Sequence, residues 1–318
     1  MKFGIYPGGR AGVTCSRESD PGRVGALVGE LGGGGPFVVR EYVHFLGARP
    51  DPAVVASIGA AGELDGLTMP DDWYVSGGRE LDLVVSYIPA VADLPGWLGF
   101  LDRVIERYAG ITRYLQVTLE PNFPIPLIDG SSPGVMAALI DGLPHARRAL
   151  DARGHGDVRV GFSVAEPAEW LGGDAEFWRR LGEADLGGVV DYVGLGLYPD
   201  AFGPPVPVAG VRAMTEHALR HLREHSLVVA GIPATTPIHV AENGSPSLAG
   251  RDQVASLATM LAVVREQEAA LNIAVYELFA LRDADTGGGE AVGALGLVTD
   301  YYVRKPAFDL YRRIVAGG

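Results

Sequence analysis

The sequence predicts an α/β protein that folds as a single (β/α)8 TIM barrel, with residues 1–318 forming one domain. Eight short runs of β-branched and aromatic residues start 31 to 46 residues apart along the 318-residue chain. Each interval can hold one strand, one helix and two loops. No Ser/Gly linker or block of like charge interrupts this pattern. Eight strands alternating with helices favour a closed parallel barrel, and an open doubly wound sheet is the structural alternative.

The individual elements follow from these runs in order. The predicted strands begin at Phe3, Phe37, Asp82, Arg113, Val158, Tyr192, Ile238 and Ile273. The predicted helices carry apolar residues at three- and four-residue spacing and cover Leu98–Tyr108, Val135–Leu150, Val254–Val264 and a closing segment, Pro306–Val315. The glycine run Gly32–Gly35 predicts a turn from a helix into a strand.

Composition limits the partners and the location of the protein. The chain has 26 Lys plus Arg against 39 Asp plus Glu, a net charge of −13, which argues against nucleic acids and anionic membranes as partners. No apolar run approaches the ~18 residues that a membrane span needs, and Met1–Pro7 lacks the apolar stretch of a signal peptide. Cys15 is the only cysteine, so a reducing compartment is expected. We therefore expect a cytoplasmic protein.

Two glutamates stand at the carboxyl ends of predicted strands, where the active site of such a barrel lies. Glu120 ends the fourth apolar run and Glu242 ends the seventh. A buried charge is costly unless it is paired or used. One interpretation is structural, with both glutamates held in salt bridges to arginines such as Arg40. The other is that the two carboxyls converge on one site and perform chemistry.

Strand alternation supports the second interpretation. Glu120 shares a predicted strand face with Gln116 and Thr118, and Glu242 shares one with Ile238 and Val240. If both faces point inward, the two glutamates project toward each other across the barrel mouth. Carboxyls ~5–5.5 Å apart are typical of retaining glycoside hydrolysis, with one as acid/base and the other as nucleophile. Their mutual charge raises the pKa of the more buried carboxyl, as a general acid requires.

Five short motifs stand in order along the chain. They are Val39–Glu41, Thr118–Asn122, Tyr198–Pro199, Val240–Gly244 and Tyr276–Phe279, the last followed by Gly296–Val298 and Lys305–Ala307. Together they resemble the motifs of the clan of retaining (β/α)8 glycoside hydrolases. In that clan an acid/base glutamate ends strand four and a nucleophile glutamate ends strand seven. The resemblance spans nearly the whole chain.

The resemblance implies a role for each candidate residue. Glu242 would be the nucleophile, and Glu120 the general acid and then the base. Arg40 and Tyr198 would hold Glu242 ionised and aimed. The sugar site would be lined by His44, Asn122 and Glu277. The implied partner is a small-molecule glycoside or glycosylated metabolite, and no metal or organic cofactor is required.

Departures from the clan pattern leave an alternative open. The asparagine that precedes the clan's acid/base, and contacts the sugar 2-hydroxyl, is Leu119 in this chain. This implies a substrate without that hydroxyl, a replacement donor such as Asn122, or weakened activity. The strand-eight tryptophan platform is not evident, and Glu277 and Phe279 occupy that stretch. The alternative is a barrel repurposed as a biosynthetic tailoring enzyme or a carbohydrate-binding pseudoenzyme.

Two other polar clusters predict no further site. His217, His221 and His225 fall at four-residue spacing without the carboxylate–histidine signature of a zinc protease, so we expect a solvated helix face. Asp283 and Asp285 follow the eighth run, but they complete no coordination shell, which favours a solvated loop.

Overall fold

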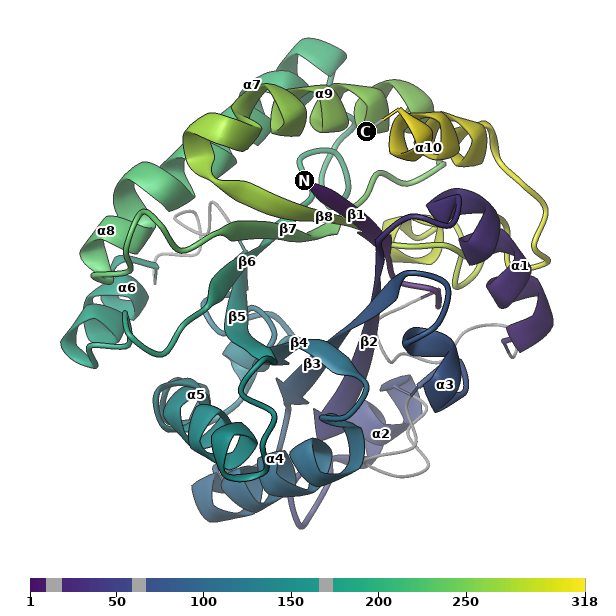
Figure 1. The fold of residues 1–318 in the computed structure, drawn as a ribbon. Helices are drawn as coiled ribbons and strands as arrows, with labels where there is room; N and C mark the ends of the chain where they lie inside the picture. Colours follow the sequence, from purple (N-terminus) through teal and green to yellow (C-terminus); the bar gives the residue numbers. More distant parts are fainter. Residues whose placement is uncertain (10–18, 59–66, 166–173, 318) are drawn as a thin grey trace.

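The computed structural model describes residues 1–9, 19–58, 67–165 and 174–317 and shows a closed barrel of parallel strands (Figure 1). Each strand pairs with the next along the chain, and β1 pairs with β8 to close the ring. The strands are β1 (Lys2–Ile5), β2 (Phe37–Phe45), β3 (Arg79–Tyr87), β4 (Thr112–Val117), β5 (Arg159–Ala165), β6 (Tyr192–Leu197), β7 (Ile238–Asn243) and β8 (Ile273–Leu278). The ring confirms the predicted (β/α)8 fold and excludes the open sheet.

The helices surround this barrel as an outer layer (Figure 1). They are α1 (Pro21–Gly32), α2 (Pro52–Ile58), α3 (Asp71–Tyr74), α4 (Leu94–Tyr108), α5 (Val135–Ala152), α6 (Asp174–Glu183), α7 (Val208–His221), α8 (Leu227–Val229), α9 (Gln253–Leu271) and α10 (Pro306–Ala316). A π-helical turn, Leu222–Ser226, joins α7 to α8. Within the described ranges, no helix is both long and apolar enough to cross a membrane.

Local sequence explains where the predicted helices begin and end. α4 starts at Leu94, before the predicted start, because the Asp93 side chain caps it by accepting a first-turn N–H at 2.9 Å. α9 runs on to Leu271, beyond the predicted end, and stops where Asn272 adopts a φ of 53°. α1 ends at Gly32, and the φ of 57° at the next residue, Gly33, starts the turn that the glycine run predicts.

Alternation along the strands divides the buried side chains between two cores. Residues such as Val39 on β2 face the helices and belong to the main apolar cluster. Inside the barrel, a small apolar layer consists of Val38, Tyr114, Tyr192 and Val275. One step closer to the carboxyl ends lies a polar layer, each residue at most 1% exposed, made of Arg40, Asp82, Gln116 and Glu277. This polar layer is the floor of the candidate site.

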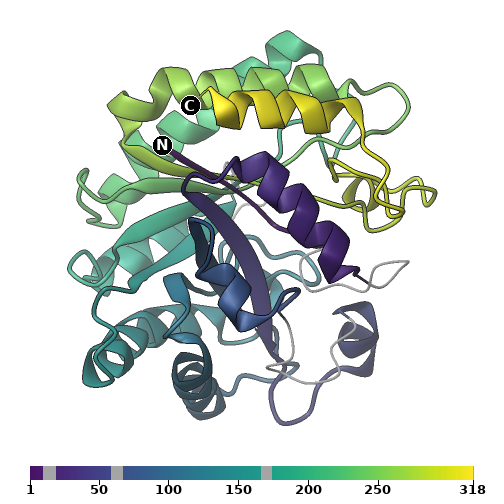
Figure 2. The ribbon, with the colours of Figure 1, turned by 45° about the vertical axis from the view of Figure 1, so that its right-hand side comes forward.

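The last helix fixes the first strand in the ring. α10 packs beside α9 and α1 (Figure 2). Its Tyr311 hydroxyl donates to the carbonyl of Gly4 at 2.6 Å, and its ring meets Phe3 edge-on. Because β1 has only four residues, these contacts help to hold it between β2 and β8.

Candidate active site

Glu242 reaches the barrel mouth through a bulge in β7. Between Val240 and Asn243, β7 advances three residues while the paired stretch of β8 advances two. Ile238 and Val240 therefore pack outward with the helices, while Glu242 turns inward. The predicted alternation, which put these three residues on one face, is wrong because of this extra residue. The inward direction predicted for Glu242 is nevertheless the observed one.

Three donors from β2 and the end of β6 bind the Glu242 carboxylate. Tyr42 donates to Oε1 at 2.6 Å, and Tyr198 donates to Oε2 at 3.0 Å. Arg40 Nη2 lies 3.5 Å from Oε1, a longer and weaker contact. Arg40 also acts indirectly, since its Nε donates to the Tyr42 hydroxyl at 2.7 Å. Arg40 and Tyr198 thus stand where the resemblance implies, and Tyr42 is a partner that sequence reasoning missed.

The floor of the site fixes Arg40. Its Nη1 donates to Asp82 at 2.6 Å and its Nη2 to Gln116 at 2.8 Å. Burial opposes the charge of Arg40, but Tyr42, Asp82 and Glu242 outweigh this effect and raise its pKa further above the usual range. The guanidinium is therefore a permanent positive charge beneath the nucleophile candidate.

Glu277 lies in this floor rather than at the rim. Its side chain is 1% exposed and lies beside Asp82. Burial, and then the charge of Asp82, raise the pKa of Glu277 well above its usual range. Glu277 is therefore a neutral acid beside Asp82 at neutral pH. The prediction that Glu277 lines the sugar site has no direct support from this placement.

Glu120 follows a strained end of β4. The strand stops at Val117, and the chain continues with positive φ angles at Thr118 (70°) and Glu120 (46°). Such angles at non-glycine residues cost on the order of 1 kcal/mol each and need support from their surroundings. Gln116 donates to the Thr118 carbonyl at 2.9 Å, and the Glu120 N–H donates to Ser163 Oγ at 3.3 Å. The alternation predicted through Glu120 is therefore wrong beyond Val117.

Buried Asp129 provides the remaining support for this segment. Its Oδ2 accepts the N–H groups of Leu119 at 2.8 Å and Tyr87 at 2.6 Å, and its Oδ1 accepts the Ser86 hydroxyl at 2.6 Å. Asp129 is fully buried and joins the end of β3 to the segment before Glu120. Sequence reasoning missed it, although a lone aspartate directly after the apolar stretch Pro126–Ile128 is a usable signal.

Gly196 on β6 makes the space that Glu120 needs. A Cβ at this position would lie 1.8 Å from Glu120 Oε1, so the carboxyl rests directly on the backbone of β6. Gly196 is also the register partner of Glu242 between β6 and β7. Glu120 and Glu242 therefore meet beside the same glycine, which is another residue that sequence reasoning missed.

The two carboxyls differ in protonation. Burial, and then the negative charge of Glu242, raise the pKa of Glu120 to about 8. Within the described ranges no group donates a hydrogen bond to the Glu120 carboxyl, which is 6% exposed. Glu242 instead accepts from three donors. At neutral pH Glu120 thus holds a proton beside a carboxyl that accepts hydrogen bonds from three donors, which is the pairing that acid-assisted nucleophilic displacement requires.

Aromatic side chains line one side of the site. Tyr6, just after β1, stacks on Phe279 with ring centroids 5.1 Å apart, and it meets Tyr42 edge-on at 5.0 Å. Leu119, which is 3% exposed, belongs to the same buried cluster, with Tyr198 packed at its edge. The position at which the clan carries a sugar-binding asparagine is thus part of an apolar wall in this protein.

The other two predicted lining residues differ in their contacts. His44 lies two positions beyond Tyr42 on the barrel-facing side of β2, and neither of its ring nitrogens has a hydrogen-bond partner among the residues that the structure describes. Burial lowers its pKa to about 4, so the ring is neutral. The Asn122 amide donates to the carbonyl of Ala165 at 2.7 Å and accepts its N–H at 3.0 Å. Asn122 therefore fastens the segment after Glu120 to the end of β5.

The other polar clusters form no metal site. Among the described residues, no group of three or more His, Cys, Asp or Glu side chains could hold a metal ion. Asp283 is fully buried and pairs with Lys305 at 2.6 Å, so the prediction of a solvated loop is wrong for Asp283 because Lys305 neutralises it there. Asp285 is exposed, as predicted. Cys15 lies outside the described residues.

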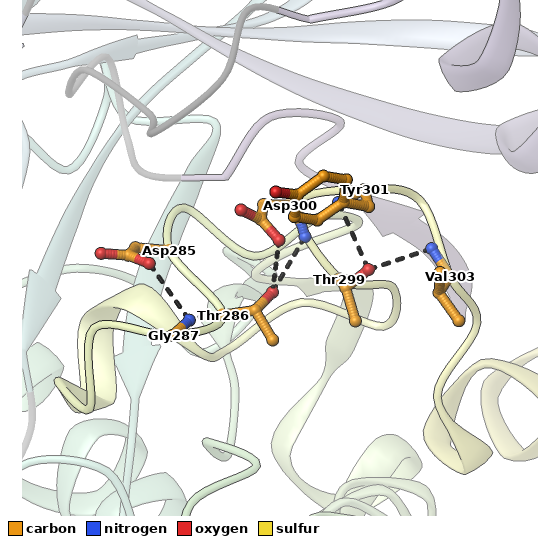
Figure 3. A pocket seen from close by; sticks show the side chains of 7 residues that line it. All are labelled: Asp285, Thr286, Gly287, Thr299, Asp300, Tyr301 and Val303. Atoms are coloured by element: carbon orange, nitrogen blue, oxygen red, sulfur yellow. Dashed lines mark hydrogen bonds between the residues drawn. The ribbon is translucent and has the colours of Figure 1, made fainter.

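A hollow of about 630 Å³ lies in the loops between β8 and α10 (Figure 3). It is lined by Asp285, Thr286, Gly287, Thr299, Asp300, Tyr301 and Val303. Its polar groups largely bind one another, since the Thr286 hydroxyl donates to Asp300 at 2.8 Å and Thr299 Oγ1 accepts the Val303 N–H at 3.0 Å. Neither Glu120 nor Glu242 lines this hollow, so the carboxyl pair remains the candidate active site.

Comparison with known proteins finds matches only among solved structures. No family model and no curated protein matches the sequence. The GH1 β-glucosidase of Exiguobacterium antarcticum B7 is 13% identical with a TM-score of 0.61, over 99% of this chain and 97% of that chain. The apo β-glucuronidase of Ruminococcus gnavus is 12% identical with a TM-score of 0.62, over 99% of this chain and 49% of that chain. The β-glycosidase BGL167 is 16% identical with a TM-score of 0.59, over 92% and 85%.

These matches establish the fold. The chain spans about half the length of the matched β-glucuronidases and nearly all of the GH1 β-glucosidase. The shared architecture agrees with the resemblance carried by the five motifs. The protein is therefore a (β/α)8 barrel with the fold of the glycoside hydrolases.

Proposed function

We propose that this protein is a retaining glycoside hydrolase that acts on a small glycoside or glycosylated metabolite. The observation that carries the proposal is the unequal pair of carboxyls beside Gly196. Glu120 retains a proton, with its pKa raised to about 8, while Glu242 accepts hydrogen bonds from three donors. One group can protonate a leaving oxygen while the other attacks carbon. The glycosidase fold supports the same reaction class.

The reaction proceeds by two displacements. Glu242 attacks the anomeric carbon, and the bond from that carbon to the leaving oxygen breaks as Glu120 gives its proton to this oxygen. This step yields an alcohol and a glycosyl ester of Glu242. Water then attacks the same carbon and gives a proton to Glu120, and the ester bond breaks to restore the Glu242 carboxylate. Two inversions at one carbon retain its configuration.

Tyr42 and Tyr198 hold the Glu242 carboxylate in one orientation throughout the two displacements. Burial raises the pKa of both hydroxyls well above the usual range, so both remain protonated and donate to the carboxylate. They bind opposite oxygens of Glu242, which fixes the rotation of the carboxyl group. Precise placement of a nucleophile is a large part of the rate advantage of an enclosed site.

The enclosure of the site supports a small substrate. Glu120 is 6% and Glu242 8% exposed, so the carboxyls lie in a confined mouth rather than on an open surface. Solved structures of the same fold are described as a β-glucosidase, a β-glucuronidase and a β-galacturonidase. These descriptions define the first panel of glycosides to test.

Leu119 favours a second candidate function. It places an apolar side chain where the clan contacts the sugar 2-hydroxyl, an interaction that strengthens in the transition state. A barrel repurposed as a biosynthetic tailoring enzyme or a carbohydrate-binding pseudoenzyme would bind glycosides without hydrolysing them. Binding and hydrolysis therefore have to be measured separately.

The test is the variant Glu242→Gln, assayed on 4-nitrophenyl β-D-glucoside, β-D-glucuronide and β-D-galacturonide. Removal of a nucleophile is expected to lower kcat by more than about 1,000-fold. The control is Glu224→Gln, which removes an exposed carboxylate that pairs with Arg220 on the outer surface of the barrel. A 2-deoxy-2-fluoro glycoside of the active sugar should add its mass to the peptide that contains Glu242.

Two outcomes would count against this proposal. A loss of less than about tenfold in Glu242→Gln would remove the nucleophile assignment. Glycoside binding without hydrolysis by the wild type would support the second candidate function instead.

A further inference from the structure

We propose that the exposed ring of Phe202 is a stacking platform for the leaving group, and that this leaving group presents a flat apolar face. The inference rests on the proposed function and adds a class of aglycone to it. An aromatic aglycone and the apolar face of a second sugar share this chemistry, and the experiment below separates them.

Phe202 contacts Tyr198, which in turn binds the proposed nucleophile, Glu242. The Tyr198 hydroxyl binds Glu242 at 3.0 Å. The Phe202 ring lies beside Tyr198, with centroids 5.3 Å apart and an interplanar angle of 57°. Tyr198 also meets Phe279 edge-on. Phe202 therefore extends the aromatic wall of the site toward solvent.

The Phe202 ring is exposed although the loop that carries it is fixed. Phe202 is 64% exposed, whereas Asp200 is 2% exposed and accepts the Ser256 hydroxyl at 3.0 Å. Arg251 donates to the Asp200 carboxylate and to the carbonyls of Asp200 and Gly203, on both sides of Phe202. A single exposed apolar side chain is common on protein surfaces. This one differs because a fixed loop holds it against an active-site tyrosine, so little entropy is lost on binding.

Glu120 indicates that this side of the mouth faces the leaving group. Its carboxyl rests on Gly196, two residues before Tyr198 on the same strand segment. The acid has to stand beside the leaving oxygen in order to protonate it. The charges of Glu242 and Glu120 both add to burial in raising the pKa of Tyr198, which agrees with Tyr198 lying close to both carboxyls. The leaving group therefore passes the end of β6, where Phe202 lies.

The first test is binding, which does not require turnover. Dissociation constants are measured for the phenyl and methyl β-glycosides of D-glucose, D-glucuronic acid and D-galacturonic acid. An aromatic platform should favour the phenyl glycoside of the bound sugar by about three- to tenfold. Phe202→Ala should abolish this preference, and Phe202→Trp should preserve it. Val229→Ala, which truncates an exposed apolar side chain on α8, should leave it unchanged.

The second test is kinetic and separates the two leaving-group types. Phe202→Ala should lower kcat/KM for a ring-bearing leaving group and leave it unchanged for the glycosyl fluoride, whose leaving group has no ring. The deglycosylation rate should not change, because the leaving group has already departed. A larger loss for the aryl glycoside identifies an aromatic aglycone, and a larger loss for the disaccharide identifies a second sugar.

These outcomes distinguish the platform from the hydrolase. A phenyl preference that depends on Phe202, without turnover by the wild type, supports the platform and overturns the proposed hydrolase function. Equal affinity for phenyl and methyl glycosides across the panel overturns the platform. An equal loss for aryl glycoside and glycosyl fluoride in Phe202→Ala also overturns it.

Discussion

Glu120 and Glu242 are the same residue type, and only their neighbours distinguish the roles that we propose for them. Glu120 rests on Gly196, and burial then raises its pKa to about 8. Glu242 lies among Tyr42, Tyr198 and Arg40, all of which donate to it. The surroundings of the two carboxyls thus differ in the way that the proposed mechanism needs.

The protonation of Glu120 predicts an alkaline limit to activity. Because the acid acts in its protonated form, kcat/KM should fall about tenfold per pH unit above about pH 8. The measurement is the pH profile of kcat/KM on a 4-nitrophenyl glycoside. With the glycosyl fluoride as substrate, fluoride leaves without taking up a proton, so the alkaline fall in kcat/KM should be smaller. An alkaline limb with a pKa below about 6 would contradict the assignment of Glu120.

The contact between Gly196 and Glu120 predicts that a single methyl group added at Gly196 lowers kcat/KM. In Gly196→Ala the new Cβ would stand 1.8 Å from Glu120 Oε1, so the acid has to move. We expect kcat/KM to fall by about 100-fold, because small misplacements of catalytic groups are costly. The control is Gly188→Ala, at an exposed position where a Cβ meets no atom within 4 Å. A folded Gly196→Ala protein with unchanged kcat/KM would show that Glu120 is not the acid.

Sequence reasoning found the two glutamates but not their closest neighbours. Glu120 and Glu242 could be predicted because each ends an apolar run within a motif. Tyr42 could not, since a tyrosine within a strand also fits a core position, although it shares a strand face with Arg40. Gly196 could not be predicted, because its function becomes apparent only when the Glu120 carboxyl is seen to lie against the backbone of β6.

At the scale of elements, the strand ends set the geometry of the site. The predicted strand positions agree well with the structure, and β2, β6, β7 and β8 begin at the predicted residues. The ends of β4 and β7 differ from prediction because a positive φ and a bulge replace simple alternation there. Both features depend on contacts with neighbouring strands, so the sequence of either strand alone does not reveal them.

Asp129 should act as a positioning residue for the end of β4. Asp129→Ala leaves the Leu119 and Tyr87 N–H groups without their acceptor, so we expect kcat/KM to fall by about 10- to 100-fold. Asp129→Asn keeps one carbonyl oxygen for both N–H groups and should retain most of the activity. Both kcat/KM and the melting temperature are measured for each variant and for the wild type. Equal activity in Asp129→Ala and the wild type would exclude this role.

At the scale of the whole molecule, the closed ring was predictable because it depends on repetition. Regular strand spacing over the whole chain predicts a barrel, and no single contact has to be known. The polar floor was not predictable, because Asp82 and Gln116 look like ordinary strand residues until β2, β3 and β4 are placed side by side. The ring thereby buries Arg40 among groups far apart in sequence.

Buried acids make the stability of the fold depend on pH. Burial raises the pKa of Glu41 and Asp129 to about 7 and that of Glu120 to about 8. The unfolded chain releases these protons near pH 4, so above that pH the folded state holds more protons and loses stability as pH rises, until Glu120, the last of the three, ionises near pH 8. His44 and His239, whose pKa values burial lowers to about 4 and about 3, lower stability below about pH 6.5.

The measurement of this effect is the melting temperature between about pH 6.5 and about pH 8. It should fall over this range. Glu41→Gln, on the helix-facing side of β2, should reduce the slope while leaving the carboxyl pair intact. A melting temperature that rises over the same range would contradict the protonation of these three buried acids.

The polar floor also bears on how well the site would stabilise positive charge that develops on a bound sugar. Glu277 keeps its proton beside Asp82, and Arg40 pairs with Asp82 at 2.6 Å while lying farther from Glu242. One guanidinium thus stands against the carboxylates of Asp82 and Glu242, which leaves a surplus negative charge among buried residues. A neutral glycoside gains little from that surplus, whereas an oxocarbenium-like centre forming above it gains a great deal. Under the proposed mechanism, the charge of the barrel interior would therefore stabilise the transition state more than the bound glycoside.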